Sequence, residues 1–123
     1  MNLKDISQLY QLKSEIEMDK QRLARLRAEK TVSLKENAGY SSDDIDEIES
    51  IIAQKIARSI RERKRLEQYI AEIPDSLTRQ IFTYRFVDGL SWDSCAARIR
   101  GGNTAKNLSN ICYRYLEKRN GQT

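Results

Sequence analysis

The last helical segment of the chain carries polar side chains that could bond to nucleic acid. Its apolar residues recur every three or four positions, which predicts one buried stripe made of Leu108, Ile111, Cys112, Tyr115 and Leu116. The positions left for the outer face are Lys106, Asn107, Asn110, Tyr113, Arg114 and Lys118. An asparagine amide can bond an adenine edge in a bidentate manner, and arginine or lysine can bond guanine or phosphate. The spacing therefore predicts a helix that packs with one face and can meet DNA with the other.

A shorter helix and a tight turn precede this segment. Ser91 is a good N-cap for a helix over Trp92–Ile99, Gly101 and Gly102 form a break, and Asn103 or Thr104 caps the last helix, which runs to about Arg119. A short helix, a tight turn and a longer polar helix have the geometry that fits a major groove. We expect the residues nearest the bases to be Lys106, Asn107, Asn110 and Arg114. The residues expected to contact phosphates are Arg98, Arg100, Thr104 and Lys118.

The positive charge of the chain is concentrated in this C-terminal region. The net charge is +4, and residues 74–123 alone carry eight Lys and Arg against four Asp and Glu. From Ser94 onward, six basic residues face one acidic residue, Glu117. A local excess of this kind indicates an acidic partner such as nucleic acid.

Two other features are interpreted as structural. The basic run Arg61–Arg65 could be a nucleic-acid patch, but the interleaved Glu62 and nearby Glu67 favour the solvated face of a helix. Trp92 is interpreted as a partly buried staple on the helix pair rather than a base-stacking group. Tyr113 either contacts phosphate or lies on the surface.

The composition excludes several kinds of chemistry. The chain has no histidine, which excludes Ser-His and Cys-His nucleophiles, histidine acid-base catalysis and most zinc sites. Cys95 and Cys112 are too few for a four-ligand metal site; both are expected to be small core residues, with a redox-sensing pair as the alternative. Asp88 and Asp93 fit turn positions rather than a catalytic pair. We therefore expect neither an enzyme nor a cofactor.

The sequence also indicates a cytoplasmic protein without a membrane partner. No apolar run approaches the ~18 residues of a membrane span. The first residues, MNLKDISQLY, lack the apolar core of a signal peptide. In a reducing cytosol a structural disulfide is not expected.

The first 73 residues are predicted to form a long antiparallel helical hairpin. One helix is expected over residues 2 to about 37, with an apolar seam of Leu9, Leu12, Ile16, Leu23 and Leu26 that Asp19 and Lys30 interrupt. Gly39 fits a C-terminal cap, and Ser41 with Asp44 fits a capping box. The second helix is expected over about 42–72, with an apolar line of Ile45, Ile48, Ile52, Ile56, Ile60, Leu66, Ile70 and Ile73. Because a long hairpin exposes much of its seam, either the C-terminal part or a second copy is expected to pack on it.

A further helix links the hairpin to the helix pair. Pro74 ends the second helix, and a new one is predicted from Ser76 to about Phe86, with an inward face of Leu77, Ile81, Phe82 and Phe86. The sequence VDGL then forms a turn around Gly89. The prediction is an all-α protein with two domains, the hairpin over 1–73 and a helix-turn-helix over 74–119.

Segment 74–118 resembles region 4 of the sigma-70 family of transcription factors. The matching pieces are RQIFTYRF, the turn VDGLSW, the helix WDSCAARI and a final basic helix. The segment is still more similar to small phage and prophage proteins with sigma-like helix-turn-helix ends, such as the late-gene activators of the ArpU and RinA type; the turn GGNTA is typical of that group. The resemblance implies promoter-type DNA recognition and contact with RNA polymerase. The chain has no room for the domain that reads the −10 promoter element, so a complete sigma factor is not expected.

The function expected from the sequence is that of a phage-derived transcriptional regulator that binds double-stranded DNA in a sequence-specific manner. The hairpin would act as a homodimerisation arm or as a docking arm for RNA polymerase. Two alternatives stay open. One is a DNA packaging protein similar to a phage terminase small subunit, and the other is a module that binds polymerase without touching DNA.

Overall fold

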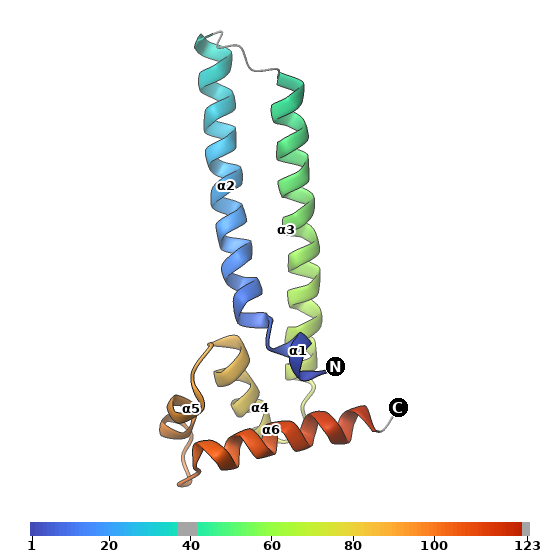
Figure 1. The fold of residues 1–123 in the computed structure, drawn as a ribbon, viewed down its shortest axis with the longest axis vertical. Helices are drawn as coiled ribbons and strands as arrows, with labels where there is room; N and C mark the ends of the chain where they lie inside the picture. The colour runs from blue at the N-terminus through green and yellow to red at the C-terminus, as the bar shows by residue number, and fades with distance from the viewer. Residues whose placement is uncertain (37–41, 122–123) are drawn as a thin grey trace. The chain divides into compact units, whose positions relative to one another are not determined.

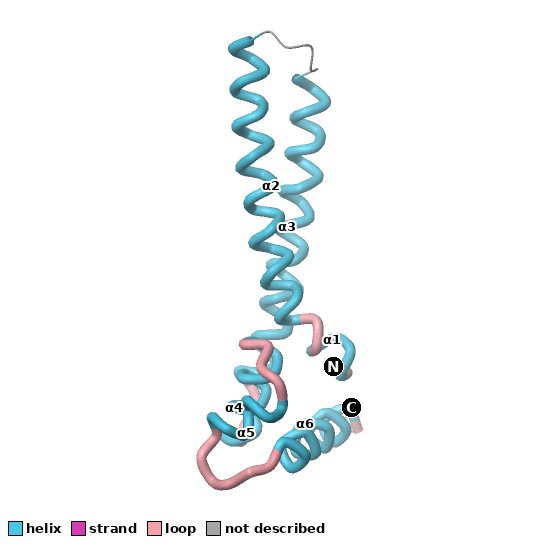
Figure 2. The backbone as a smooth tube through the Cα atoms, turned by 60° about the vertical axis from the view of Figure 1, so that its left-hand side comes forward, coloured by secondary structure: helices cyan, strands magenta, loops and turns pink. Residues whose placement is uncertain are grey.

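The computed structural model describes residues 1–36 and 42–121 of the chain (Figure 1). Every regular element in this part is helical, and Figure 2 shows helices joined by loops without a strand. The predicted all-α class is therefore confirmed. The elements are α1 (Leu3–Ile6), α2 (Leu9–Glu36), α3 (Ser42–Ala71), α4 (Ser76–Phe82), the π-helical turn η1 (Thr83–Val87), α5 (Trp92–Arg98) and α6 (Ala105–Asn120). The predicted caps at Gly39 and Ser41 lie outside the described residues.

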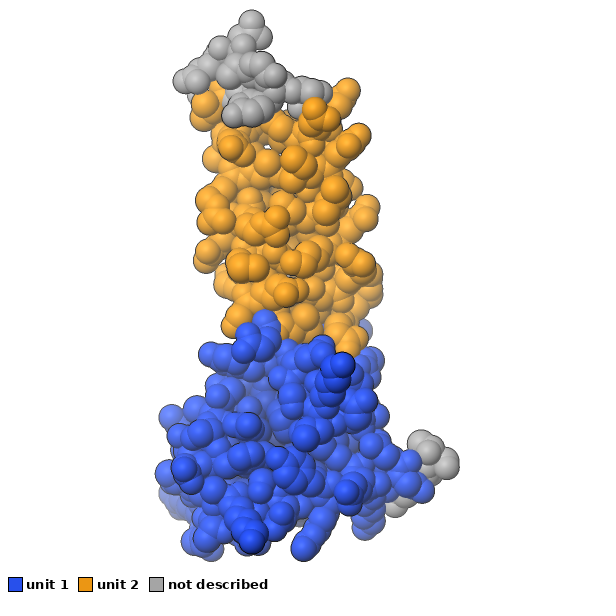
Figure 3. Space-filling model, viewed as in Figure 1, with its two compact units in different colours: residues 1–11, 63–123 blue, residues 12–62 orange. Residues whose placement is uncertain are grey.

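The chain folds into two compact units. Unit 1 contains Met1–Gln11 and Arg63–Thr123, and unit 2 contains Leu12–Glu62 (Figure 3). The long helices α2 and α3 each contribute residues to both units. This division differs from the predicted domains 1–73 and 74–119, because apolar side chains from both long helices are buried with the C-terminal helices. The ring of Tyr69 in α3, for example, lies 6.3 Å from the ring of Phe82 in α4, measured between centroids.

In unit 2, α2 and α3 run antiparallel and pair through a narrow seam. Lys55 of α3 lies 3.0 Å from the carboxylate of Asp19, whereas the earlier Asp46 and Glu49 pair with the later Lys30 and Arg27 of α2. Within unit 2 the buried residues of α3 follow a seven-residue spacing: Ile45, Ile52 and Ser59. This is the spacing of a seam that faces a single neighbouring helix.

Two members of the predicted apolar line do not lie in this seam. Ile48 is 45% exposed and Ile60 is 44% exposed, so the prediction that they are buried is wrong. The reason is that one partner helix covers a stripe with a seven-residue repeat. Ile48 and Ile60 lie on either side of that stripe, on the flanks of α3.

Asp19, which interrupts the apolar pattern in the sequence, is fully buried in the seam. Its Oδ1 accepts a hydrogen bond of 3.0 Å from Arg22, and its Oδ2 forms an ion pair with Lys55 that is close but not aligned as a hydrogen bond. Burial by itself raises the pKa of this carboxyl, but Lys55 and Arg22 outweigh burial, and the pKa lies below its ordinary value. The charge of Asp19 therefore stabilises the helix pair.

We expect the Asp19 ion pair to make stability depend on pH. A carboxyl whose pKa is lowered by folding contributes stability above about pH 4, and this contribution is lost as the pH falls through the folded-state value. An Asp19→Asn variant should melt at a lower temperature than wild type at pH 7 and should lose less stability on acidification. Melting followed by circular dichroism from pH 7 to pH 2 measures both effects. Glu17→Gln, at an exposed position of the same helix, is the control and should follow wild type.

The predicted first helix is in fact two helices. The backbone breaks at Ser7 and Gln8, so that α1 is a single short turn capped by Asn2, whose side chain accepts a hydrogen bond of 2.8 Å from the Asp5 amide. Ile6, before the break, and Leu9, after it, are both fully buried in unit 1.

The predicted helix over 76–86 also ends differently. Asp75 caps α4 by accepting hydrogen bonds from the amide and hydroxyl of Thr78, and α4 passes after Phe82 into the wider turn η1, where the Asp88 amide donates to the Thr83 carbonyl at 3.0 Å. The rings of Phe82 and Phe86 lie next to each other, with their centroids 5.3 Å apart. Ile81, Phe82 and Phe86 are buried as predicted, whereas Leu77 is half-buried.

Candidate nucleic-acid interface

Local capping and glycine turns build the α5–α6 pair. The Ser91 hydroxyl caps α5 by accepting a hydrogen bond of 3.1 Å from the Ser94 amide, and Thr104 caps α6 in the same way through the Asn107 amide. Between the helices, Gly101 and Gly102 have φ angles of 115° and 68°. Because such angles strain residues that carry a Cβ, two consecutive glycines allow the chain to reverse within a few residues.

The inner face of α6 is the predicted stripe. Leu108, Cys112 and Leu116 are buried, while Ile111 and Tyr115 are half-buried. Cys95 of α5 and Cys112 are free and fully buried. Burial raises the pKa of both thiols, that of Cys112 to about 12, so neither has the thiolate character of a reactive cysteine at neutral pH. The two thiols serve as small packing groups in this core.

The outer face of α6 presents the predicted contact residues. Lys106, Asn107, Arg114 and Lys118 are exposed and Asn110 is half-buried. At about 100° per residue, these five positions fall within roughly a third of the helix circumference. Glu117 lies within the same arc. Arg98, at the end of α5, and Arg100, in the turn, are also exposed.

The basic side chains of this face have no acidic partner within the described part of the chain. The ion pairs of the protein do not include Arg98, Arg100, Lys106, Arg114 or Lys118. Arg119 is different, because its guanidinium pairs with Glu72 at 3.4 Å and covers the ring of Tyr69 at 4.2 Å. Five of the six C-terminal cations are therefore available to an acidic ligand, and the sixth braces α6 against α3.

Two of the predicted contact residues already make bonds at the start of α6. Thr104 uses its hydroxyl as the helix cap, and the Asn107 side chain donates a hydrogen bond of 3.3 Å to Asn103. Base contact by Asn107 would require this weak bond to open or to be shared. The predicted residues thus form a polar cluster at the start of α6, with Arg114 and Lys118 farther along the same face.

A stacked group beside this face was not predicted from the sequence. The Arg85 guanidinium lies 4.9 Å from the centre of the Trp92 ring, and Tyr113 meets Trp92 edge to face at 6.2 Å. Arg85 also donates a hydrogen bond of 2.9 Å to the Leu90 carbonyl. These contacts hold Trp92 half-buried between η1 and α6, as expected of a staple. The contact of Arg85 with Trp92 could not be predicted from the sequence, because Arg85 lies in η1 and Trp92 in α5.

The turn before α5 contacts the start of α2 closely. Gly89 has a φ of 70°, and a Cβ at this position would lie 2.6 Å from the ring of Tyr10. Gly102 has a similar φ of 68° but open space around it. A side chain would therefore strain the backbone at both glycines, but it would collide with a neighbouring residue only at Gly89.

We expect Gly89→Ala to destabilise unit 1 more than Gly102→Ala does. Backbone strain alone should cost about 1–2 kcal/mol at either position, and at Gly89 the displaced Tyr10 ring adds to it. Urea unfolding of both variants measures the difference. In the background Tyr10→Ala, the cost of Gly89→Ala should fall to that of Gly102→Ala. Equal costs in the wild-type background would mean that the ring moves aside freely.

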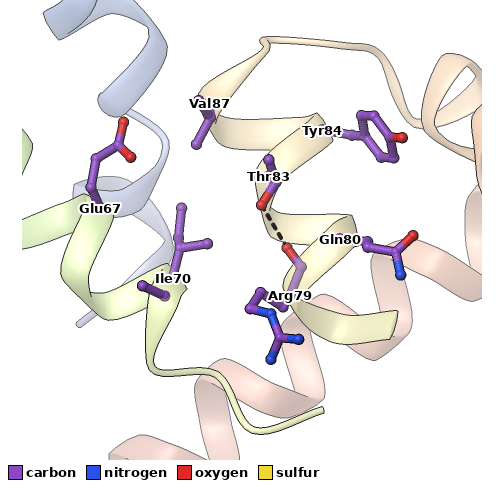
Figure 4. Close-up of a pocket in the computed structure, with 8 residues that line it drawn as sticks. Glu67, Ile70, Arg79, Gln80, Thr83, Tyr84 and Val87 are labelled. Atoms are coloured by element: carbon purple, nitrogen blue, oxygen red, sulfur yellow. Dashed lines mark hydrogen bonds between the residues drawn. The ribbon is translucent and has the colours of Figure 1, made fainter. Parts of the chain in front are cut away.

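A shallow groove of about 420 Å³ lies between the end of α3 and the α4–η1 segment (Figure 4). Its lining residues are Glu67, Ile70, Ala71, Arg79, Gln80, Thr83, Tyr84 and Val87. Two of its polar groups are already bonded, since Arg79 donates to the Ile73 carbonyl at 2.7 Å and Thr83 to the Arg79 carbonyl at 2.8 Å. The groove therefore offers mixed polar and apolar surface rather than a set of converging free polar groups.

The described residues do not contain a group of three or more Cys, Asp or Glu side chains placed to hold a metal ion. None of the described helices has the length and apolar character needed to cross a bilayer. These observations leave the α5–α6 face as the strongest candidate site. No known protein family matches this chain, and no curated protein or solved structure is significantly similar to it.

Proposed function

We propose that unit 1 binds double-stranded DNA through the outer face of α6 and the end of α5, as a helix-turn-helix, and that the protein regulates transcription. The observation that carries the proposal is a group of exposed cations without an ion pair in the described chain: Arg98 at the end of α5, Arg100 in the turn, and Lys106, Arg114 and Lys118 on the outer face of α6. Basic side chains that lack internal partners are free to neutralise phosphates and to release their counterions.

The proposed roles follow from position on the helices. Lys106, Asn107, Asn110 and Arg114 occupy the part of α6 that would enter a major groove and contact base edges. Arg98, Arg100, Thr104 and Lys118 flank it and would contact phosphates. The resemblance to sigma region 4 and to phage late activators supports promoter DNA as the ligand. Cytoplasmic location and contact with RNA polymerase belong to the same proposal.

Binding to random duplex DNA at a series of salt concentrations tests the proposal. Four to six phosphate contacts predict a slope of log K against log salt of roughly −3.6 to −5.4. A flat response, or no binding at low salt, would exclude DNA as the ligand of this face.

We expect Arg114→Ala to weaken binding to a selected cognate site by ~1–3 kcal/mol and binding to random DNA much less, because a base contact carries sequence information. Selection of bound sequences from a random pool supplies the site, and fluorescence anisotropy measures both affinities. Lys118→Ala is the comparison and should weaken both complexes equally. Equal losses for Arg114→Ala would reduce Arg114 to a phosphate contact.

The groove beside α4 favours one second candidate, a module that binds RNA polymerase or another protein without DNA. Its mixed lining is suited to a protein segment (Figure 4). In that case Tyr84→Ala, which changes the groove, would abolish binding to the protein partner. Neither the wild type nor the variant would then bind DNA. The third possibility, a packaging protein similar to a terminase small subunit, predicts ring-sized oligomers in solution.

A further inference from the structure

A second stripe on α3 carries charges that have no partner among the described residues. Its members follow each other at alternating spacings of three and four residues and are all exposed: Asp44, Glu47, Ile51, Gln54, Arg58 and Arg61. This is the spacing of a coiled-coil seam. Ile51 stands near the middle of the stripe and, at 65%, is more exposed than any other large apolar residue of the described protein.

The stripe is separate from the seam that pairs α3 with α2. The charges of α3 that face α2 are matched, since Asp46, Glu49 and Lys55 all form ion pairs with residues of α2. The four charged side chains of the stripe do not form a hydrogen bond or ion pair with any described residue. The acidic pair stands at the start of the stripe and the basic pair at its end.

We propose that this stripe is a self-complementary interface at which a second copy of the chain pairs antiparallel, α3 against α3. In one coiled-coil register Asp44 faces Arg61 of the second copy, Glu47 faces Arg58 of the second copy, and Ile51 faces Gln54 of the second copy. Two-fold symmetry repeats each contact. A parallel pairing would instead place Asp44 beside Asp44 and Arg58 beside Arg58, so the charges select the antiparallel direction.

This dimer should depend on salt, because exposed ion pairs surround a small apolar centre. The screening length is about 10 Å at 0.1 M salt and about 3 Å at 1 M, so attraction across the stripe weakens as salt rises. The interface lies wholly in unit 2 and does not rest on the DNA-binding proposal.

Charge reversal on the full-length protein tests the interface, with mass measured by sedimentation equilibrium at about 50 mM and about 500 mM salt. Wild type should show twice the 14.3 kDa chain mass at low salt and shift toward the single chain at high salt. Glu47→Arg and Arg58→Glu should each be monomeric at low salt, because each places like charges opposite each other. The double variant Glu47→Arg with Arg58→Glu exchanges the two charges and should restore the dimer.

Matched reversals outside the stripe are the controls. Glu29→Arg and Lys64→Glu change the net charge by the same amounts at other exposed positions and should leave the dimer intact. Circular dichroism verifies that every variant remains helical. A monomeric wild type at low salt, dimers in both single variants, or a double variant that stays monomeric would each overturn the proposal.

Discussion

Replacing four outward cations of the α5–α6 face by glutamine is expected to lower affinity for random duplex DNA on the order of 10²-fold near 0.1 M salt. The four residues are Arg98, Lys106, Arg114 and Lys118. Arg98 and Lys118 are the proposed phosphate contacts among the four, and each contributes about 0.9 to the salt slope, so their loss should flatten the slope by about 1.8. Anisotropy titrations with a labelled random duplex at several salt concentrations measure both quantities.

A control variant with the same net charge shows whether DNA binds at the α5–α6 face or is attracted by the overall positive charge of the protein. The control variant replaces four exposed cations that lie on α1, α2 and α3: Lys4, Lys20, Arg25 and Lys64. Because it lowers the net charge equally, any effect of overall charge on DNA association should appear in both variants. Similar losses in the two variants would show that DNA is not held at the α5–α6 face.

The second large effect is expected at Phe82. This ring is fully buried and lies among aromatic neighbours, with centroids 5.3 Å from Phe86 and 5.6 Å from Tyr115. Phe82→Ala removes that packing and leaves a cavity, which should reduce the free energy of unfolding by about 3–5 kcal/mol. Urea unfolding followed by the fluorescence of the single tryptophan, Trp92, reports on unit 1 directly.

An exposed apolar residue provides the comparison. Met18 is 51% exposed, and Met18→Ala should change stability by no more than about 0.5 kcal/mol. DNA binding by Phe82→Ala should fall in parallel with the folded fraction, because Phe82 supports α6 without facing outward. A Phe82→Ala protein as stable as wild type would mean that α4 does not form the core of unit 1.

Features that depend on neighbouring residues were predictable from the sequence. Capping by Ser91 and Thr104, the glycine turn and the buried stripe of α6 all rest on contacts within a few positions. The same local rules predicted one helix over residues 2–37, which the structure interrupts at Ser7 and Gln8. They also predicted a helix over 76–86, which the structure shows as helical through Val87 but with a wider last turn. Neither the break before Leu9 nor the wide turn after Phe82 follows from the local sequence pattern, which would equally allow a continuous α-helix.

Interactions between residues far apart in the chain could not be predicted from the sequence. Asp19 and Lys30 looked like interruptions of an apolar seam, yet both lie in it, since Lys55 and Asp46 of the other helix match their charges. Likewise, the close contact of Gly89 with Tyr10 joins residues almost eighty positions apart. Sequence periodicity predicts which face of its own helix a side chain occupies. It does not predict which residue of another helix contacts that side chain.

By itself, the sequence determined that the described chain is helical and that α6 has an apolar inner face and a polar, basic outer face. Both follow from composition and from the helical period, which are properties of single segments. Only the tertiary structure decided which charges stay unpaired: Arg119 is bound to Glu72, whereas Arg114 and Lys118 are open to a ligand. The difference arises because an ion pair requires two charges within about 4 Å, and that distance is set by the packing of separate helices.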